Sequence, residues 1–130
     1  NIDVLITVDM TDEDWQIYID TIVKSTQVID PDTGYSVWES AYKLHFDSTN
    51  SIHGNALFLY AHRYFMVYVE KKLQKINPKF SFFYWDSSRE FNFWTQSKIF
   101  SKLGHATTSG PCDGPFEKIK FKITNNLAMN

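Results

Sequence analysis

The chain has 130 residues, of which 43% are hydrophobic and 17% aromatic, and its formal net charge at pH 7 is -2. This composition predicts a globular domain with an apolar core and excludes the class of disordered chains. Acidic and basic residues are interspersed and nearly cancel, so we expect neither nucleic acid nor an anionic membrane as a partner. No apolar run approaches the roughly 18 residues that a membrane-spanning helix requires.

The ends and the cysteine content bear on domain organisation. Cys112 is the single cysteine, which excludes an intrachain disulfide and a cysteine-based zinc or iron-sulfur site. We expect Cys112 to be a small, partly buried hydrophobic residue or an inert thiol. The chain starts at Asn1 without methionine or the regions of a signal peptide. We therefore expect residues 1–130 to form one domain that is part of a longer product, and the compartment stays open, secretion included.

The N-terminal quarter predicts a strand and then a helix. Apolar residues alternate with polar ones over residues 2–8, which is typical of a strand. Thr11, followed by three acidic residues, is the predicted N-cap of a helix. Apolar residues from Trp15 to Val23 recur at helical spacing and indicate a face that packs on a core. The sequence Asp-Pro-Asp-Thr-Gly at 30–34 ends this element.

Two further helices are predicted in the middle of the chain. Ser36 and Glu39 have the spacing of a capping box, and the apolar stripe that follows them ends at His45, which we expect on the buried face. A third helix is predicted over residues 61–76, with His62 at the start of its inner stripe. The two helices are expected to form an antiparallel pair that brings His45 close to His62.

The rest of the chain predicts short elements and loops. Residues 80–85 are apolar and are expected to be extended, and 87–93 form a loop. A short helix is predicted over 95–103, a turn over 110–115, and a half-buried strand over 118–123. Together the elements predict a mainly α fold, namely a partial antiparallel helix bundle with short peripheral strands and long loops.

Three of the four histidines fall within eighteen residues, namely His45, His53 and His62. A single buried histidine is more often a hydrogen-bonded core residue than a metal ligand, so their number alone proves little. The predicted helix pair, however, places His45 and His62 at facing helix ends, and His53 in the connection between them. Neutral imidazole suits copper and zinc, and three such ligands without a thiolate leave one coordination position open.

The residues around these histidines resemble the first copper-binding half of the tyrosinase family. Its pattern is roughly HG-x-x-x-FLPWHR, six residues, E, and then PYWDW. This chain has His53-Gly54, then Phe58, His62-Arg63, Glu70 and Tyr84-Trp85-Asp86 in the same order. The segment Cys112-Asp113-Gly114-Pro115-Phe116 resembles the C-x-x-DGPF element that follows in fungal members. The resemblance spans about residues 11 to 116.

The resemblance implies a copper-dependent oxidoreductase that oxidises phenols or o-diphenols to o-quinones with dioxygen. In the family two copper ions face each other, and each is held by three histidines. His45, His53 and His62 would be the ligands of the first copper. After His62 only His105 remains, so we expect a missing second copper-binding half, one copper ion in this chain, and no activity of this piece alone.

Two alternatives stay open. The same copper geometry serves a non-catalytic metal-binding or dioxygen-carrying protein when access to the site is blocked. A degenerate structural domain without copper would also keep parts of the motif. A small phenolic substrate and dioxygen are the partners implied by the catalytic interpretation.

The chain departs from the family pattern at positions that are not ligands. Tyr60-Ala61 stands in place of Pro-Trp before the His-Arg pair, Ser87 replaces the last Trp of YWDW, and Ser51 stands where many members have a cysteine bonded to the second histidine. Loss of aromatic packing there could loosen the surroundings of the ligands. Four aromatic residues at helical spacing could form a platform for a substrate, but the spacing favours a packing role: Tyr60, Tyr64, Phe65 and Tyr68.

Other residues are predicted to surround the site. Phe58 is expected beside the copper pocket. Glu70 and Asp86 are candidates to orient the imidazoles or to form a buried ion pair with Arg63, and the ion pair is favoured. Arg63 projects about 100° away from His62 on the helix and is expected to brace the segment. His105, in a polar loop, is expected to be exposed to solvent.

Overall fold

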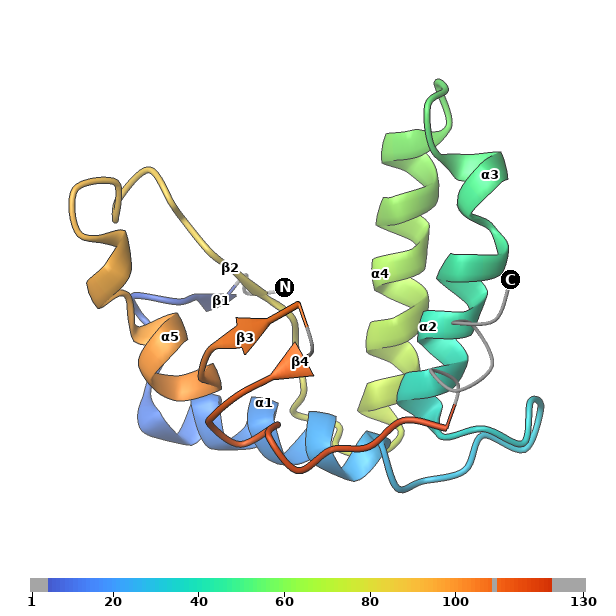
Figure 1. The fold of residues 1–130 in the computed structure, drawn as a ribbon, viewed down its shortest axis with the longest axis horizontal. Coiled ribbons are helices and arrows are strands. Elements are labelled where there is room, and N and C mark those ends of the chain that lie inside the picture. Colours follow the sequence, from blue (N-terminus) through green and yellow to red (C-terminus); the bar gives the residue numbers. More distant parts are fainter. Residues whose placement is uncertain (1–4, 109, 123–130) are drawn as a thin grey trace.

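The computed structural model describes residues 5–108 and 110–122 (Figure 1). The predicted mainly α fold is confirmed, because within these residues the strands are only two residues long and the longest elements are helices. No helix in the described ranges is long and apolar enough to cross a membrane. The elements in chain order are β1 (Leu5–Ile6), α1 (Asp12–Ser25), α2 (Val37–Asp47), α3 (Thr49–Ile52), α4 (Phe58–Gln74), β2 (Phe83–Tyr84), a 3-10 helix (Trp94–Gln96), α5 (Lys98–Leu103), β3 (Ala106–Thr107) and β4 (Gly110–Pro111).

The predicted caps of the first two helices are confirmed. The Thr11 hydroxyl accepts a hydrogen bond from the Asp14 amide, and the Asp14 carboxylate accepts one from the Thr11 amide. Ser36 and Glu39 make the same reciprocal pair at the start of α2. Each box satisfies two backbone donors that a helix N-terminus leaves without a partner, which is why both helices begin where the sequence predicted.

The third predicted helix begins earlier than expected. Helix α4 starts at Phe58 rather than Ala61 and has no side-chain cap. The cause lies in Asn55, whose side-chain oxygen accepts a hydrogen bond from the Leu57 amide while its carbonyl accepts one from the Phe58 amide. This turn, typical of asparagine, directs the chain into the helix three residues before the predicted start.

Helices α2 and α4 lie side by side and antiparallel, as predicted, and α1 crosses one end of the pair (Figure 1). The core lies at this crossing. Apolar stripes of the three helices meet there, and Phe80 closes the cluster after the chain leaves α4. The buried members are Ile22, Val37, Ala41, Val69, Leu73 and Phe80.

An ion pair ties the connection between α1 and α2 to α4. The Asp30 carboxylate is 2% exposed and accepts a hydrogen bond from the Lys72 ammonium at 3.0 Å. Asp32 also contacts this ammonium, at 3.2 Å, and its amide donates to the Asp30 side chain. Burial opposes ionisation of Asp30, but these hydrogen bonds outweigh it and lower its pKa below the ordinary value. The predicted turn at 30–34 is thus also an anchor for α4.

The strands differ most from the sequence-based prediction. Within the described residues β1 covers only Leu5–Ile6, which pairs in parallel with β2, and Ile2 and Val4 of the predicted strand lie outside these residues. A hairpin of β3 and β4 occupies part of the predicted turn at 110–115. The prediction of a strand over 118–123 is wrong as far as residue 122, and Ile123 lies outside the described residues.

Candidate metal centre

The three predicted ligands come from three different elements at the end of the α2–α4 pair that lies away from α1. His45 is on the last turn of α2, His53 directly follows the single turn of α3, and His62 is on the second turn of α4. Gly54, with φ 72°, follows His53 and turns the chain back toward α4. Helices α2 and α4 therefore supply one imidazole each, and the connection between them supplies the third.

The structure brings the three imidazoles together. Nε2 of His45 is 3.2 Å from Nε2 of His62, and one ligand atom from each of the three histidines lies within 4.8 Å of the others. Ring centroids are 5.3 Å apart for His45 and His53, and 4.9 Å apart for His53 and His62. Each side chain is half-buried. Within the part of the chain that the structure describes, these are the residues that cluster as potential metal ligands.

Backbone carbonyls orient two of the rings. Nδ1 of His53 lies 2.9 Å from the Thr49 carbonyl oxygen, and Nδ1 of His62 lies 2.7 Å from the Phe58 carbonyl oxygen. A carbonyl only accepts, so Nδ1 carries the proton in both rings and Nε2 keeps a free lone pair. In each case the carbonyl belongs to the residue four positions earlier, and the Thr49 carbonyl also accepts a hydrogen bond from the His53 amide. The geometry assigns Nε2 as the donor atom of both rings.

The donor set fits copper. Two nitrogens that bind one cation at 2.0–2.1 Å in tetrahedral directions are about 3.3–3.4 Å apart, close to the 3.2 Å between His45 and His62. Imidazole is a good ligand for copper and zinc. A metal-bound histidine usually donates its other N–H to a carbonyl or carboxylate, and His53 and His62 already do so.

Two phenylalanines enclose the cluster. The ring of Phe58 lies 4.3 Å from that of His62 and 5.6 Å from that of His53, measured between centroids. Phe65 lies 5.4 Å from His45. Phe58 is therefore beside the histidines, where the sequence placed it, whereas Phe65 was interpreted only as a packing residue. Its position three residues after His62 on the same helix is the signal that could have found it.

The other predicted neighbours do not contact the histidines. Glu70 accepts a hydrogen bond from the Phe82 amide at 2.9 Å and so holds the segment that leads to β2. Asp86 accepts hydrogen bonds from Ser88, which lower the pKa of Asp86, and from the Arg89 amide. Arg63 is exposed and forms no ion pair within the described ranges, so the favoured ion pair is wrong. The orienting role considered for these carboxylates belongs to the carbonyls of Thr49 and Phe58.

Two of the predicted packing residues are exposed. Tyr60 and Tyr64 have 78% and 74% of their surface accessible, whereas Phe65 and Tyr68 pack against the core cluster. Both exposed tyrosines lie near the metal end of α4. The aromatic stripe that the sequence predicted is therefore wider than the face of α4 that the fold buries.

His105 is exposed, as predicted, but it has defined partners away from the cluster. Its Nδ1 lies 2.9 Å from the Asp113 carboxylate, its ring stacks on Phe100, and its carbonyl accepts a hydrogen bond from the Cys112 amide. Hydrogen bonds that the Asp113 carboxylate accepts from the His105 backbone amide and then from the His105 ring lower the pKa of Asp113 below its ordinary value. Cys112 is exposed, so the prediction of a partly buried hydrophobic residue is wrong, and the inert thiol stays a prediction. In the sequence, the resemblance to the DGPF element was the only signal for this contact between His105 and Asp113.

Glycine is required where the segments around His105 and Asp113 meet. A Cβ atom at Gly104 would approach the Asp113 backbone oxygen to 2.5 Å, and one at Gly114 would approach the Leu103 carbonyl oxygen to 2.8 Å. Both glycines also have positive φ. The DGPF element therefore holds the β3–β4 hairpin against the end of α5.

Two cavities flank His45 and Phe65, which line both of them. The first, about 250 Å³, also contacts Tyr42, Met66 and Phe82, and we name it the Phe82 cavity. The second, about 200 Å³, also contacts Ala61, Tyr64 and Tyr68, and we name it the Ala61 cavity. The metal cluster is therefore bordered by space that a small molecule can enter.

The comparisons with known proteins agree with this geometry. A family model described as the common central domain of tyrosinase matches residues 35–129, which include all three clustered histidines. No curated protein and no solved structure matches the chain. Since the match covers most of the sequence, and the residues that it spans form a cluster of three imidazoles suited to copper, the chain belongs to the tyrosinase family.

Proposed function

We propose that the chain forms the first-copper part of an oxidoreductase that converts phenols or o-diphenols to o-quinones with dioxygen. The observation that carries this proposal is the convergence of His45, His53 and His62, with Nδ1 of two rings already bonded to carbonyls. Copper bound there would supply the redox chemistry that passes electrons from the phenol to dioxygen.

The residues of this chain would hold the copper ion and orient the imidazoles that bind it. Three neutral imidazoles would bind one copper ion and leave a coordination position for an exogenous molecule. The Thr49 and Phe58 carbonyls fix the tautomers of His53 and His62, so no proton has to leave their Nε2 atoms before they bind. Phe58 packs against two of the rings, which restricts their rotation.

The Phe82 cavity is the place that we propose for the phenol ring. It lies beside His45 and is lined by the apolar side chains of Met66 and Phe82 together with Tyr42. Its volume of about 250 Å³ exceeds the roughly 150 Å³ of an apolar cavity that takes up benzene. A single-ring phenol therefore fits there, with its hydroxyl directed toward the histidines.

We further propose that a second copper-binding half packs on the metal end of α4. Leu59, His62 and Met66 follow one another on one face of this helix, and both apolar residues are exposed, as is Tyr42 on α2. Exposed apolar residues gathered around a site are typical of a surface that another part of the protein covers. The fourth histidine of the sequence, His105, is bonded to Asp113, so a second set of ligands has to come from outside this chain.

Copper titration of the chain tests the metal site. We expect one copper per chain for the parent protein, and a loss of stoichiometric binding in His62→Ala. His105→Ala is the matched control, because it removes an exposed imidazole outside the cluster and should leave the stoichiometry unchanged. Equal copper retention in the two variants would refute the ligand assignment.

Turnover then separates the proposed reaction from the alternatives. Oxidation of an o-diphenol should be measured, together with copper content, on protein that carries both sets of histidines. Copper with turnover supports the oxidoreductase, copper without turnover supports a non-catalytic metal-binding or dioxygen-carrying protein, and absence of copper supports a structural domain.

A further inference from the structure

The Ala61 cavity lies on the opposite side of the His45–Phe65 contact from the Phe82 cavity. On α4 it is lined by positions 61, 64, 65 and 68, whereas the Phe82 cavity is lined by 65, 66 and 69. These sets flank Phe65 on the two sides of the helix. The Ala61 cavity contacts Leu44 on α2 and Ser48 directly after this helix, neither of which lines the Phe82 cavity. The two cavities therefore share His45 and Phe65 as a common wall, and their other lining residues differ.

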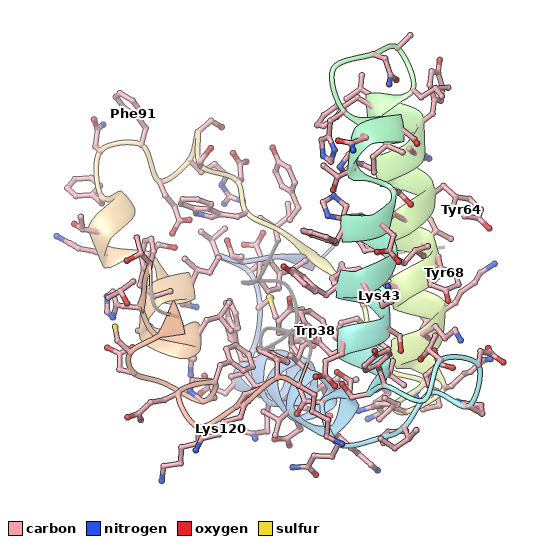
Figure 2. All side chains as sticks on the ribbon, turned by 45° about the vertical axis from the view of Figure 1, so that its right-hand side comes forward. Trp38, Lys43, Tyr64, Tyr68, Phe91 and Lys120 are labelled. Carbon is pink, nitrogen blue, oxygen red and sulfur yellow. The ribbon has the colours of Figure 1, made fainter. Side chains whose placement is uncertain are left out.

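The Ala61 cavity exists because a small residue stands between large ones. Its α4 wall has the spacing of one helix face, and Ala61 is the one position there without a ring. Tyr64 and Tyr68, which line this cavity, project from α4 on the side away from α5 (Figure 2). Position 61 is also where the chain has alanine in place of the tryptophan of the family pattern. The space next to Ala61 thus has aromatic and aliphatic walls.

The volume and the charge of the cavity define the ligand class. An apolar cavity of about 150 Å³ takes up benzene, and this one has about 200 Å³, enough for one ring or two small fused rings. No acidic, lysine or arginine side chain lines it, so a charged ligand would lose hydration without compensation. Ser48, Tyr64 and Tyr68 also line the cavity, and each of these side chains carries a hydroxyl group that can accept or donate a hydrogen bond.

We propose that the Ala61 cavity is a binding site for a neutral, planar aromatic small molecule with one polar group, separate from the phenol site. The ring packs between Tyr64 and Ile52, and Phe65 separates it from the Phe82 cavity. Binding requires the small side chain of Ala61. Copper is not required, so this proposal and the proposed reaction stand or fall independently.

Indole is the probe, and methyl NMR of the metal-free 130-residue chain locates it. Leu44 and Ile52 line the Ala61 cavity and Met66 lines the Phe82 cavity, so the methyl signals of these residues report on the two sites. We expect indole to shift the Leu44 and Ile52 signals in a saturable manner and to leave the Met66 signal in place. Saturable shifts of Met66 without those of Ile52 would overturn the proposal, as would the absence of saturable shifts.

Filling the cavity provides the second test. Ala61→Trp should lower the affinity for indole at least tenfold, because the new indole side chain occupies the site. Ala106→Trp adds the same side chain to an exposed position in β3 and should leave the affinity unchanged. If Ala61→Trp does not fold, Ala61→Leu fills the cavity in part and should weaken binding in the same direction. Unchanged affinity in a folded position-61 variant would refute the site.

Discussion

The two ends of the α2–α4 pair are built in opposite ways. Where α1 crosses, Leu73 is fully buried, and side chains from three helices and Phe80 close around it. At the other end the three histidines are only half-buried, and Leu59 on the same helix is 74% exposed. One helix thus runs from a packed core to an open site within four turns.

This difference separates stability from chemistry. Burial of apolar side chains supplies most of the free energy of folding, and it is concentrated at the α1 end. Ligand atoms need access for a metal and a substrate, so the other end must remain open. A rigid element anchored at one end can hold ligands in place at the other.

The largest effect is expected from Leu73→Ala at the packed end. Removing a buried leucine side chain costs about 2–5 kcal/mol of unfolding free energy. Leu59→Ala, the same change on the exposed end of the same helix, should stay within about 0.5 kcal/mol. Denaturant unfolding of both variants measures the contrast, and similar losses would show that the two ends do not differ in the way described.

Lys72→Met should have the next largest effect, because it leaves the buried Asp30 carboxylate without its cation. Breaking a buried pair costs about 3–5 kcal/mol. Lys72 is partly accessible and Asp32 is exposed, so we expect about 2–3 kcal/mol, by denaturant unfolding at pH 7. Asp32→Asn is the control, since its carboxylate is 78% exposed, and its effect should be much smaller.

The same pair predicts a pH dependence. The pKa of Asp30 is lowered from its ordinary value of 3.8, and that of Lys72 is raised from 10.5. The stabilisation is therefore complete between these two ordinary values, is lost as the pH falls through the folded-state pKa of Asp30, and is lost as the pH rises through that of Lys72. The stability difference between parent and Lys72→Met should shrink in acid, and a difference that grows below pH 3.8 would contradict the sign.

Phe58→Leu probes the open end. Loss of the ring that packs against His62 and His53 should lower copper affinity by about 10–100-fold, as for other residues that support metal ligands, with little change in unfolding free energy. Phe91→Leu, which alters an exposed ring in the loop before the 3-10 helix, is the matched control. Equal copper affinities in the two variants would show that Phe58 does not support the metal ligands.

Features that depend on local sequence were predictable. The capping boxes at Thr11 and Ser36 need only residues three positions apart. Spacing, helix periodicity and the family pattern were enough to identify the three clustered histidines as candidate ligands of one metal ion. Asn55 was overlooked, although asparagine is a common turn residue, and the start of α4 was misplaced for that reason.

Features carried by the backbone or by tertiary contacts were not predictable. The carbonyls of Thr49 and Phe58 lie only four residues before the histidines that they orient, but a backbone group carries no side-chain signal, so carboxylates were the natural candidates for this role. Alternation over residues 118–123 indicated a strand, but in the described part Ile119 and Phe121 instead border a cavity with Tyr18 and Trp38. An alternation of apolar and polar residues indicates that one side of the segment is buried, but it does not indicate whether a neighbouring strand is present to pair with it.

The central claim is that three imidazoles bind one copper ion, two of them through Nε2. Pulsed EPR of the Cu(II)-loaded chain tests this most directly, because it counts coordinated imidazoles through their remote nitrogens. We expect three imidazoles for the parent chain and for His105→Ala, and two for any copper that His62→Ala still retains. An unchanged count in His62→Ala, or coordination by oxygen atoms alone in the parent, would contradict the account.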